Sequence, residues 1–226
     1  MAAGLGAGYM LWLRDSSLVA VRDVKVVGID SAERAEVSAA LTDAARGMTT
    51  LHVREDELRA AARRYPTVGS VSADPHFPNG LTIEVKERKP IAIVATDGRD
   101  LPVAGDGTVL PGISTAGLEL PALEASGDTS KPRLADAALE QARVLGAAPA
   151  PLRPLLDHAV DDEDGISVRL ADGIVLRFGD ASDADEKWEA AARILADGDL
   201  QGLSYIDVRA PERPAVGGAS AVPGTV

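Results

Sequence analysis

Acidic side chains dominate the ionisable residues of this 226-residue chain and are the first candidates for chemistry. The sequence holds 35 Asp and Glu residues against 23 Lys and Arg. Paired carboxylates could act as general acid and base in a hydrolase, and clustered carboxylates could bind Ca²⁺. The densest cluster is VDDEDG at residues 160–165. With Gly165 as the loop glycine of an EF-hand, ligand positions 1 and 12 would fall on Val160 and Ala171, which carry no carboxylate, so that motif fails.

Other patterns of catalytic and metal sites are also missing. His52, His76 and His158 have no acid or base at a helical or strand spacing that would build a site. Without cysteine there can be no disulfide, thiolate zinc site or cysteine nucleophile. No G-x-S-x-G or Walker loop occurs. We therefore expect no enzyme activity, no cofactor, no metal and no small-molecule substrate. A solvated turn is the expected role of residues 160–165, with weak cation binding and a secreted carboxylate-dependent hydrolase as alternatives.

Charge is distributed unevenly along the chain. Residues 19–89 carry 11 basic and 11 acidic side chains, whereas residues 90–210 carry 10 basic and 22 acidic ones. Such a break in composition predicts a domain boundary near residue 90. Neither half has the clustered Lys and Arg of a phosphate-binding face, so nucleic acid is not an expected partner.

The first 13 residues, MAAGLGAGYMLWL, contain no charged side chain. A helix that crosses a bilayer needs about 20 such residues. A signal peptide needs positive charge before its apolar region, and none precedes Arg14. We interpret residues 1–18 as the end of a truncated transmembrane helix and its connector. A flexible apolar N-terminus and a short buried helix are the alternatives.

The sequence pattern differs before and after residue 90. Periodicity and turn residues before residue 90 predict a strand, two helices and two strands, at 21–29, 31–46, 55–64, 68–74 and 81–86. This β-α-α-β-β order predicts a small α+β domain. After residue 90 we expect a β-rich domain with two helices, comprising a meander (91–110), a helix (134–145), a hairpin (166–180), a helix (183–196) and a last strand (203–209). The Pro- and Gly-rich residues 211–226 are expected to be disordered.

Several fragments resemble the FtsQ/DivIB family of bacterial cell-division proteins. In the first half these are VRDVKVVGIDSAERAEV and YPTVGSVSADPHFPNGLTIEVKERKPIA. In the second half VATDGRDLPVAGDGTVL, LPALEA, DGIVLRFGD and YIDVRAPERPAV occur in the family's order. The resemblance covers about residues 19–216. Thr67 and Phe77 stand where the family often has tryptophan, and Ala125 where it usually has glycine.

The resemblance implies a POTRA domain at 19–89 and an FtsQ-type β domain at 90–210. It further implies a single-pass cell-membrane protein whose two domains lie outside the cytoplasm, at the division septum. Such a protein would be a non-enzymatic scaffold that binds FtsB/DivIC-like and FtsL-like division proteins. The alternative is a POTRA-containing secretion or assembly component that binds extended client peptides.

The tetrad Glu87-Arg88-Lys89-Pro90 would then be the junction between the two domains. Pro90 removes a backbone donor, so sheet pairing cannot continue smoothly through it. A joint this short would hold two domains at a set angle better than a flexible linker would. A charged strand end on a solvated edge is the alternative.

The last strand is the candidate partner site, with Tyr205, Ile206, Asp207, Val208 and Arg209 as its residues. Pro211 and Pro214 follow it, so we expect that the chain does not fold back into another strand. An open sheet edge leaves backbone donors and acceptors that a partner's strand can pair with. Tyr205 would be an aromatic contact and Arg209 a rim charge. An inner strand with a proline-capped end is the alternative.

Overall fold

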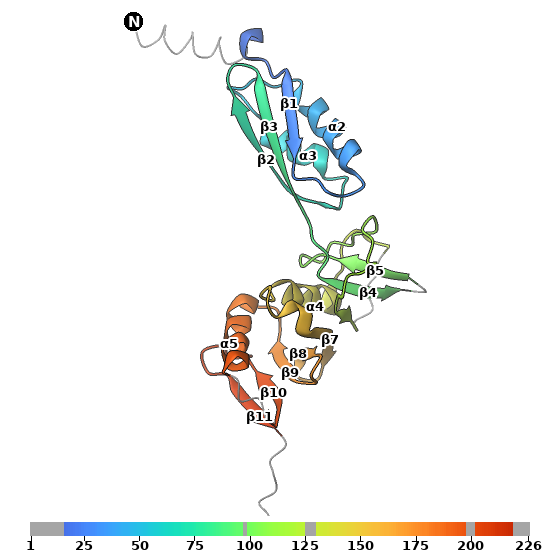
Figure 1. Ribbon diagram of the computed structural model, residues 1–226, viewed down its shortest axis with the longest axis vertical. Coiled ribbons are helices and arrows are strands. Elements are labelled where there is room, and N and C mark those ends of the chain that lie inside the picture. Colours follow the sequence, from blue (N-terminus) through green and yellow to red (C-terminus); the bar gives the residue numbers. More distant parts are fainter. Residues whose placement is uncertain (1–15, 97–98, 125–129, 198–201, 219–226) are drawn as a thin grey trace, which may run out of the picture. The chain divides into compact units, whose positions relative to one another are not determined.

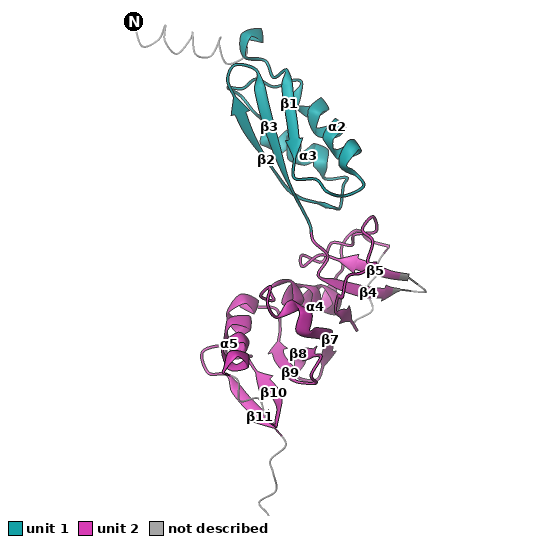
Figure 2. Ribbon diagram, in the orientation of Figure 1, with its two compact units in different colours: residues 1–88 teal, residues 89–226 magenta. Residues whose placement is uncertain are grey.

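In the computed structural model, residues 16–96, 99–124, 130–197 and 202–218 are described. The chain divides between Arg88 and Lys89 into two units, each with its own sheet and hydrophobic core (Figure 2). The expected α+β class is confirmed. No helix among the described residues has the length and apolarity needed to cross a membrane. The predicted anchor falls largely on residues 1–15, which lie outside the described ranges.

The first unit has the predicted β-α-α-β-β order (Figure 1). After a short η1 (Ser17–Val19), its elements are β1 (Asp23–Val27), α2 (Arg34–Ala45), α3 (Glu55–Ala62), β2 (Val68–His76) and β3 (Gly80–Glu87). β3 pairs in parallel with β1 and antiparallel with β2, so the sheet order is β1-β3-β2. The central strand of this sheet is therefore the last of the unit's three strands in sequence.

Alternation along β3 places this unit's core. Leu81, Ile83 and Val85 are at most 3% exposed, and they pack with buried side chains of α2 and α3 such as Leu41 and Leu58. The residues between them in β3 are partly or fully exposed. The strand predicted at residues 81–86 is thus confirmed, and it is half-buried because one face of the sheet meets the helices and the other meets solvent.

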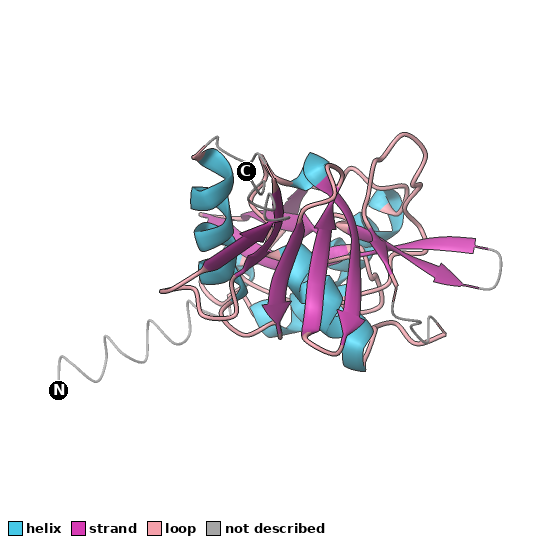
Figure 3. Ribbon diagram, turned by 90° about the horizontal axis from the view of Figure 1, so that it is seen from below, coloured by secondary structure: helices cyan, strands magenta, loops and turns pink. Residues whose placement is uncertain are grey.

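The second unit is built on one eight-stranded sheet in the order β11-β10-β9-β8-β7-β6-β4-β5. Figure 3 distinguishes the strands of the protein from its helices and loops. Its strands are β4 (Ala92–Thr96), β5 (Arg99–Val103), β6 (Ala122–Leu123), β7 (Leu156–Asp162), β8 (Gly165–Leu170), β9 (Val175–Gly179), β10 (Leu203–Asp207) and β11 (Ala215–Gly218). Its helices are α4 (Asp136–Gly146), α5 (Ala184–Ala196) and the short η2 (Arg153–Leu155). The two predicted α-helices are both present.

Trp188 of α5 is the largest side chain buried in this core. It is 0% exposed, and its ring lies 4.8 Å from that of Phe178 in β9. Its Nε1 donates a 2.7 Å hydrogen bond to the carbonyl of Val144 in α4. A buried indole needs such a partner, and here the partner joins the two helices of the unit.

Three strands of this unit, β6, β7 and β11, differ from the sequence prediction. β7 was not predicted, because its acidic end was interpreted only as a turn. β11 lies inside residues 211–226, so the prediction of a disordered tail is wrong for residues 215–218. The backbone reverses direction where the amide of Arg213 donates to the carbonyl of Ala210 at 2.9 Å. Pro211 is the second residue of this turn, a position where proline is common because its fixed φ fits the turn.

Candidate functional site

The predicted partner strand is not at the edge of its sheet. β10 pairs in parallel with β9 and antiparallel with β11, which covers its other side. The prediction of an open edge at residues 205–209 is therefore wrong. The open edge of the second unit lies one strand further out, at β11, and nothing among the described residues pairs with its outer side.

The five predicted contact residues fall into two groups. Ile206 and Val208 are 0% exposed and belong to the core, so they cannot touch a partner without unfolding of the unit. Tyr205 and Asp207 are partly exposed, and Arg209 is exposed. Alternation along the strand explains the division, since odd-numbered residues point away from the core.

Tyr205 lies between an arginine and a glycine. The guanidinium of Arg177 in β9 stands 4.4 Å from the centre of the Tyr205 ring, a cation–π contact. On the other side Tyr205 pairs with Gly217 of β11. A side chain at position 217 would overlap the ring, so the tyrosine occupies the space that this glycine leaves open.

Arg209, Asp207 and Asp164 form an ion-pair network beside Tyr205. Arg209 Nη2 lies 2.6 Å from Asp207 Oδ2, and its Nε lies 3.1 Å from both carboxylate oxygens. Its Nη1 also reaches Asp164 Oδ1 at 3.4 Å. Hydrogen bonds from Arg209 lower the pKa of the Asp207 carboxyl, and Asp207 in turn raises the pKa of Arg209.

Asp164, in the acidic segment of residues 160–165, forms ion pairs with two arginines. It contacts Arg209 and also Arg177, whose Nη1 lies 3.7 Å from Asp164 Oδ2. The Asp164 amide donates to Asp162 Oδ1 at 2.9 Å, which tightens the turn between β7 and β8. The segment thus supplies a counter-ion to the two arginines. No sequence signal indicated this, because the pair with Arg209 spans 45 residues.

The sheet has a second edge, at β5, but this edge is partly covered. The amide of Leu110 donates to the carbonyl of Pro102 at 2.8 Å, and Val103 forms a bridge with Val109. The sequence of β5 also includes charged residues and a proline, which discourage pairing with another chain. β11, with the sequence AVGG, has neither charge nor proline. Its Val216 is 56% exposed.

The junction residues divide between the two units. Glu87 accepts hydrogen bonds from the amides of Asp30, at 2.9 Å, and of Ser31, at 3.2 Å. Arg88 Nη1 donates to the carbonyls of Pro66 and Val68. These bonds tie both residues to the first unit. Lys89 and Pro90 belong to the second unit.

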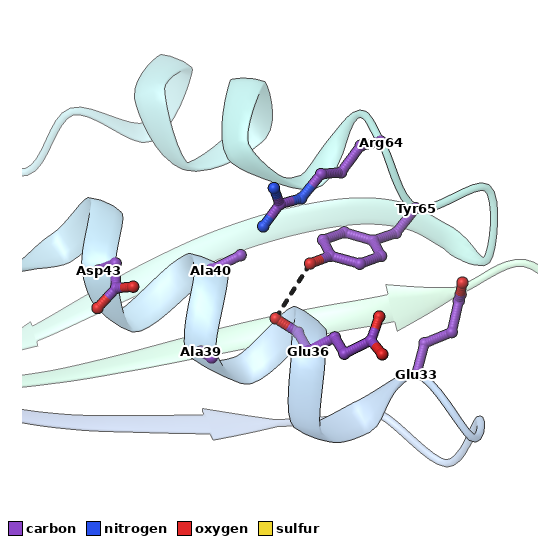
Figure 4. Close-up of a pocket in the computed structure, with 7 residues that line it drawn as sticks. All are labelled: Glu33, Glu36, Ala39, Ala40, Asp43, Arg64 and Tyr65. Atoms are coloured by element: carbon purple, nitrogen blue, oxygen red, sulfur yellow. Dashed lines mark hydrogen bonds between the residues drawn. The ribbon is translucent and has the colours of Figure 1, made fainter.

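A shallow pocket of about 580 Å³ lies on the first unit, beside α2 and the end of α3 (Figure 4). It is lined by Glu33, Glu36, Ala39, Ala40, Asp43, Arg64 and Tyr65. The Tyr65 hydroxyl donates to the carbonyl of Glu36 at 3.1 Å, and the Arg64 guanidinium lies 5.0 Å from the Tyr65 ring centre. Glu33 accepts a hydrogen bond from Thr67. The Tyr65 hydroxyl and the Glu33 carboxylate thus have partners, and the residues that line the pocket include no nucleophile with an adjacent base.

Two histidines contact carboxylates at the surface. His158 lies 2.9 Å from Asp157 and 3.6 Å from Glu124. His76 Nε2 lies 3.7 Å from Asp74. The Glu124 contact was invisible in the sequence because β6 and β7 bring together residues 34 positions apart. Within the described residues no three His, Asp or Glu side chains are grouped so that they could hold a metal ion.

Comparisons with known proteins agree with this architecture. The model of the FtsQ-type POTRA domain matches residues 19–88, and that of the C-terminal region of cell division protein FtsQ/DivIB matches residues 92–209. Cell division protein FtsQ of Streptomyces collinus is 29% identical over 224 residues, covering 94% of this chain and 84% of that protein. FtsQ of Streptomyces griseus is 28% identical over 207 residues, covering 89% and 98%.

A solved structure is also similar. It is the major extracytoplasmic domain of the cell division protein DivIB from Geobacillus stearothermophilus. The identity is 22% and the TM-score 0.34, covering 50% of this chain and 98% of that one. Because the two domain models match consecutive parts of one chain, in the order that the two structural units follow, the chain belongs to the FtsQ/DivIB family of cell division proteins.

Proposed function

We propose that this protein is a non-enzymatic scaffold of the division machinery, and that its outermost strand, β11, binds a partner by strand addition. The observation that carries the proposal is that nothing among the described residues pairs with the outer side of β11, whereas the opposite edge, at β5, is partly covered. Family membership supports the role in division. The proposed partner is an FtsB/DivIC-like protein, with an FtsL-like protein in the same assembly.

Val216 indicates where an added strand would gain apolar contact. It pairs with Ile206 in the antiparallel register of β10 and β11. Directly paired residues lie on the same face of a sheet. Ile206 is 0% exposed and Val216 is 56% exposed. On this face of the sheet, the side chain in β10 is therefore buried and the paired side chain in β11 is left largely open to solvent. A partner strand with an apolar residue at the matching position would bury the side chain of Val216.

Tyr205 and Arg209 have supporting roles in this proposal. Tyr205 packs against β11 and holds the edge strand in register rather than reaching the partner itself. Arg209 is fixed by Asp207 and Asp164, so its charge stands in a defined place at the rim. A fixed charge at a rim contributes more to the choice of partner and the association rate than to affinity.

The membrane anchor is the second element of the proposal. Residues 1–13 carry no charge and would form the outer end of a single membrane span, with both units outside the cytoplasm at the septum. Membrane fractionation of the full-length gene product, followed by protease treatment from each side, tests this arrangement. A product found only in the soluble fraction would contradict it.

Replacement of Val216 by lysine tests the sheet edge. Lysine on an edge strand disfavours pairing with another strand, so affinity for the FtsB-like partner should fall by about tenfold or more. The side chain is already exposed, so the fold should survive. Leu155→Lys is the matched control, since it places the same charge at an apolar residue of η2 that is 46% exposed. Equal affinities of the two variants for the partner would overturn the proposed edge.

A further inference from the structure

Three large apolar side chains are exposed at one end of the first unit. Leu18 in η1 is 64% exposed, Leu51 after α2 is 46% exposed, and Phe77 in the turn between β2 and β3 is 73% exposed. Exposed apolar side chains that gather in one place mark contact with another protein or with a membrane. Half of the large exposed apolar residues in the described ranges lie at this end.

Hydrogen bonds hold the three segments together. Asn79 Nδ2 donates to the carbonyls of Leu18 and Ala20, at 3.1 and 2.7 Å. Thr50 donates from its amide to the carbonyl of Val19 at 2.8 Å, and from its hydroxyl to that of Pro78 at 3.0 Å. Leu18 is therefore part of this network, and Leu51 and Phe77 are each next in sequence to a residue in it. Figure 1 shows η1 beside the turn from β2 to β3.

We propose that this end of the unit, defined by Leu18, Leu51 and Phe77, inserts its apolar side chains into the membrane interface. The inference rests on the proposed anchor in residues 1–13. Leu18 follows Leu13 by five residues, which span at most about 17 Å when fully extended. Apolar side chains of interfacial segments enter the boundary between headgroups and acyl chains by about 5–10 Å. The patch therefore lies within reach of the surface to which the anchor would tether it.

Contact of this kind would restrict the orientation of the first unit. A single tether leaves an attached domain free to turn, whereas three apolar contacts on different segments define a plane. Arg22 lies at the same end, where its Nη2 donates to the carbonyl of Ser17 at 3.2 Å. A guanidinium at this position favours a surface that contains anionic lipid.

The absence of cysteine makes the proposal testable with single labels on the full-length protein. A cysteine at His76 would carry a fluorophore next to the patch without removing any of its three residues. A cysteine at exposed Ser70, in the same strand but about 20 Å further along it, is the matched control. A third cysteine, at Gly8, reports on the anchor.

The labelled proteins are reconstituted into vesicles of phosphatidylethanolamine and phosphatidylglycerol, 3:1, that contain lipid with a nitroxide near the start of its acyl chain. Because nitroxides quench only nearby fluorophores, we expect the fraction quenched at His76 to be at least about threefold greater than at Ser70, given the 5–10 Å depth of interfacial side chains. Adding the double substitution Leu51→Ser and Phe77→Ser should bring quenching at His76 down to the level at Ser70. Both side chains are exposed, so the core is unchanged.

The outcomes separate the two proposals. Without quenching at Gly8, the proposed anchor fails and this inference fails with it. With quenching at Gly8 but equal quenching at His76 and Ser70, the anchor stands and the interfacial contact is wrong. If quenching at His76 is high but survives the double substitution, the tether alone holds this end near the bilayer, which also overturns the contact.

Discussion

Tyr205 in β10 covers the backbone of Gly217 in the edge strand β11, in a register that pairs the two residues directly. The ring occupies the space where any side chain at position 217 would begin. On its other side it receives the guanidinium of Arg177. The edge strand thus depends on one glycine and on the aromatic ring that packs against it.

Gly217→Ala should weaken the pairing of β11 with β10, because the new methyl group overlaps the Tyr205 ring. The amide of Val208 donates to Arg177 in β9, so the amides of Tyr205 and Asp207 face β11. These two amides should lose hydrogen-exchange protection, whereas the rest of the second unit keeps its own. Affinity for the FtsB-like partner should fall in parallel, since an edge that is not formed cannot template a strand.

The double variant Gly217→Ala, Tyr205→Ala is the control, because removal of the ring removes the overlap. It should recover protection at the amide of Asp207 relative to Gly217→Ala alone. If Gly217→Ala by itself retains full protection there, the ring moves aside readily and the edge does not depend on this contact.

Strong local patterns predicted most of the fold. The periodicity that predicted a strand at 81–86 and a helix at 183–196 matched a described element in each case, because each pattern reflects burial on one face of that element. β7 and β11 were missed for physical reasons. β7 ends in charged residues that stabilise a turn, and β11 contains two glycines and gains its order from pairing with β10.

The candidate site was harder to predict from the sequence than the fold was. Pro211 and Pro214 suggested that the chain could not return to the sheet, but prolines also favour the turns that reverse a chain. This inference placed the edge one strand too far inward. The partners of Arg209 and Tyr205, Asp164 and Gly217, depend on the strand order β11-β10-β9-β8, which no local pattern encodes.

Asp180 should stabilise the second unit through the buried Lys187. Lys187 is 3% exposed, and its Nζ contacts Asp180 Oδ1 at 2.8 Å and the carbonyl of Phe178 at 3.0 Å. The hydrogen bond from Lys187 lowers the pKa of Asp180 from 3.8 to about 2. Because the carboxylate itself is largely exposed and screened, Asp180→Asn should cost about 1 kcal/mol at pH 7.

The pH dependence of that cost follows from the lowered pKa. A carboxyl with a depressed folded-state pKa stabilises the fold fully above the unfolded value of 3.8 and loses this effect as pH falls through about 2. About half of the difference between wild type and Asp180→Asn should remain at pH 3. Urea unfolding at pH 7, 4 and 3 measures it. Glu189→Gln, which removes a charge from an exposed position of α5, is the control, and an equal cost there would contradict a specific role for Asp180.

Insertion of Gly-Gly-Ser after Lys89 should leave both units folded and broaden their relative orientation. Glu87 and Arg88 keep their hydrogen bonds to the first unit, because the insertion follows them. The added residues form a flexible coil. Small-angle scattering of the soluble domains should show a larger maximum dimension and a less defined distance distribution. An unchanged curve would mean that residues 87–90 do not fix the angle between the domains.

Gly28 and Gly173 should respond differently to the same substitution by alanine. Both have positive φ, 84° and 91°. A Cβ at Gly28 would overlap the carbonyl oxygen of Val85 in β3, whereas a Cβ at Gly173 would meet open space. Gly173→Ala should therefore cost about 1 kcal/mol, from backbone strain alone. Gly28→Ala should cost more than about 2 kcal/mol, because the backbone of β1 must also move away from β3. Hydrogen exchange of amides in β3 and in β9 reports on each unit separately. Equal losses of protection in the two units would show that close approach of the backbones at Gly28 adds nothing to the cost of its conformation.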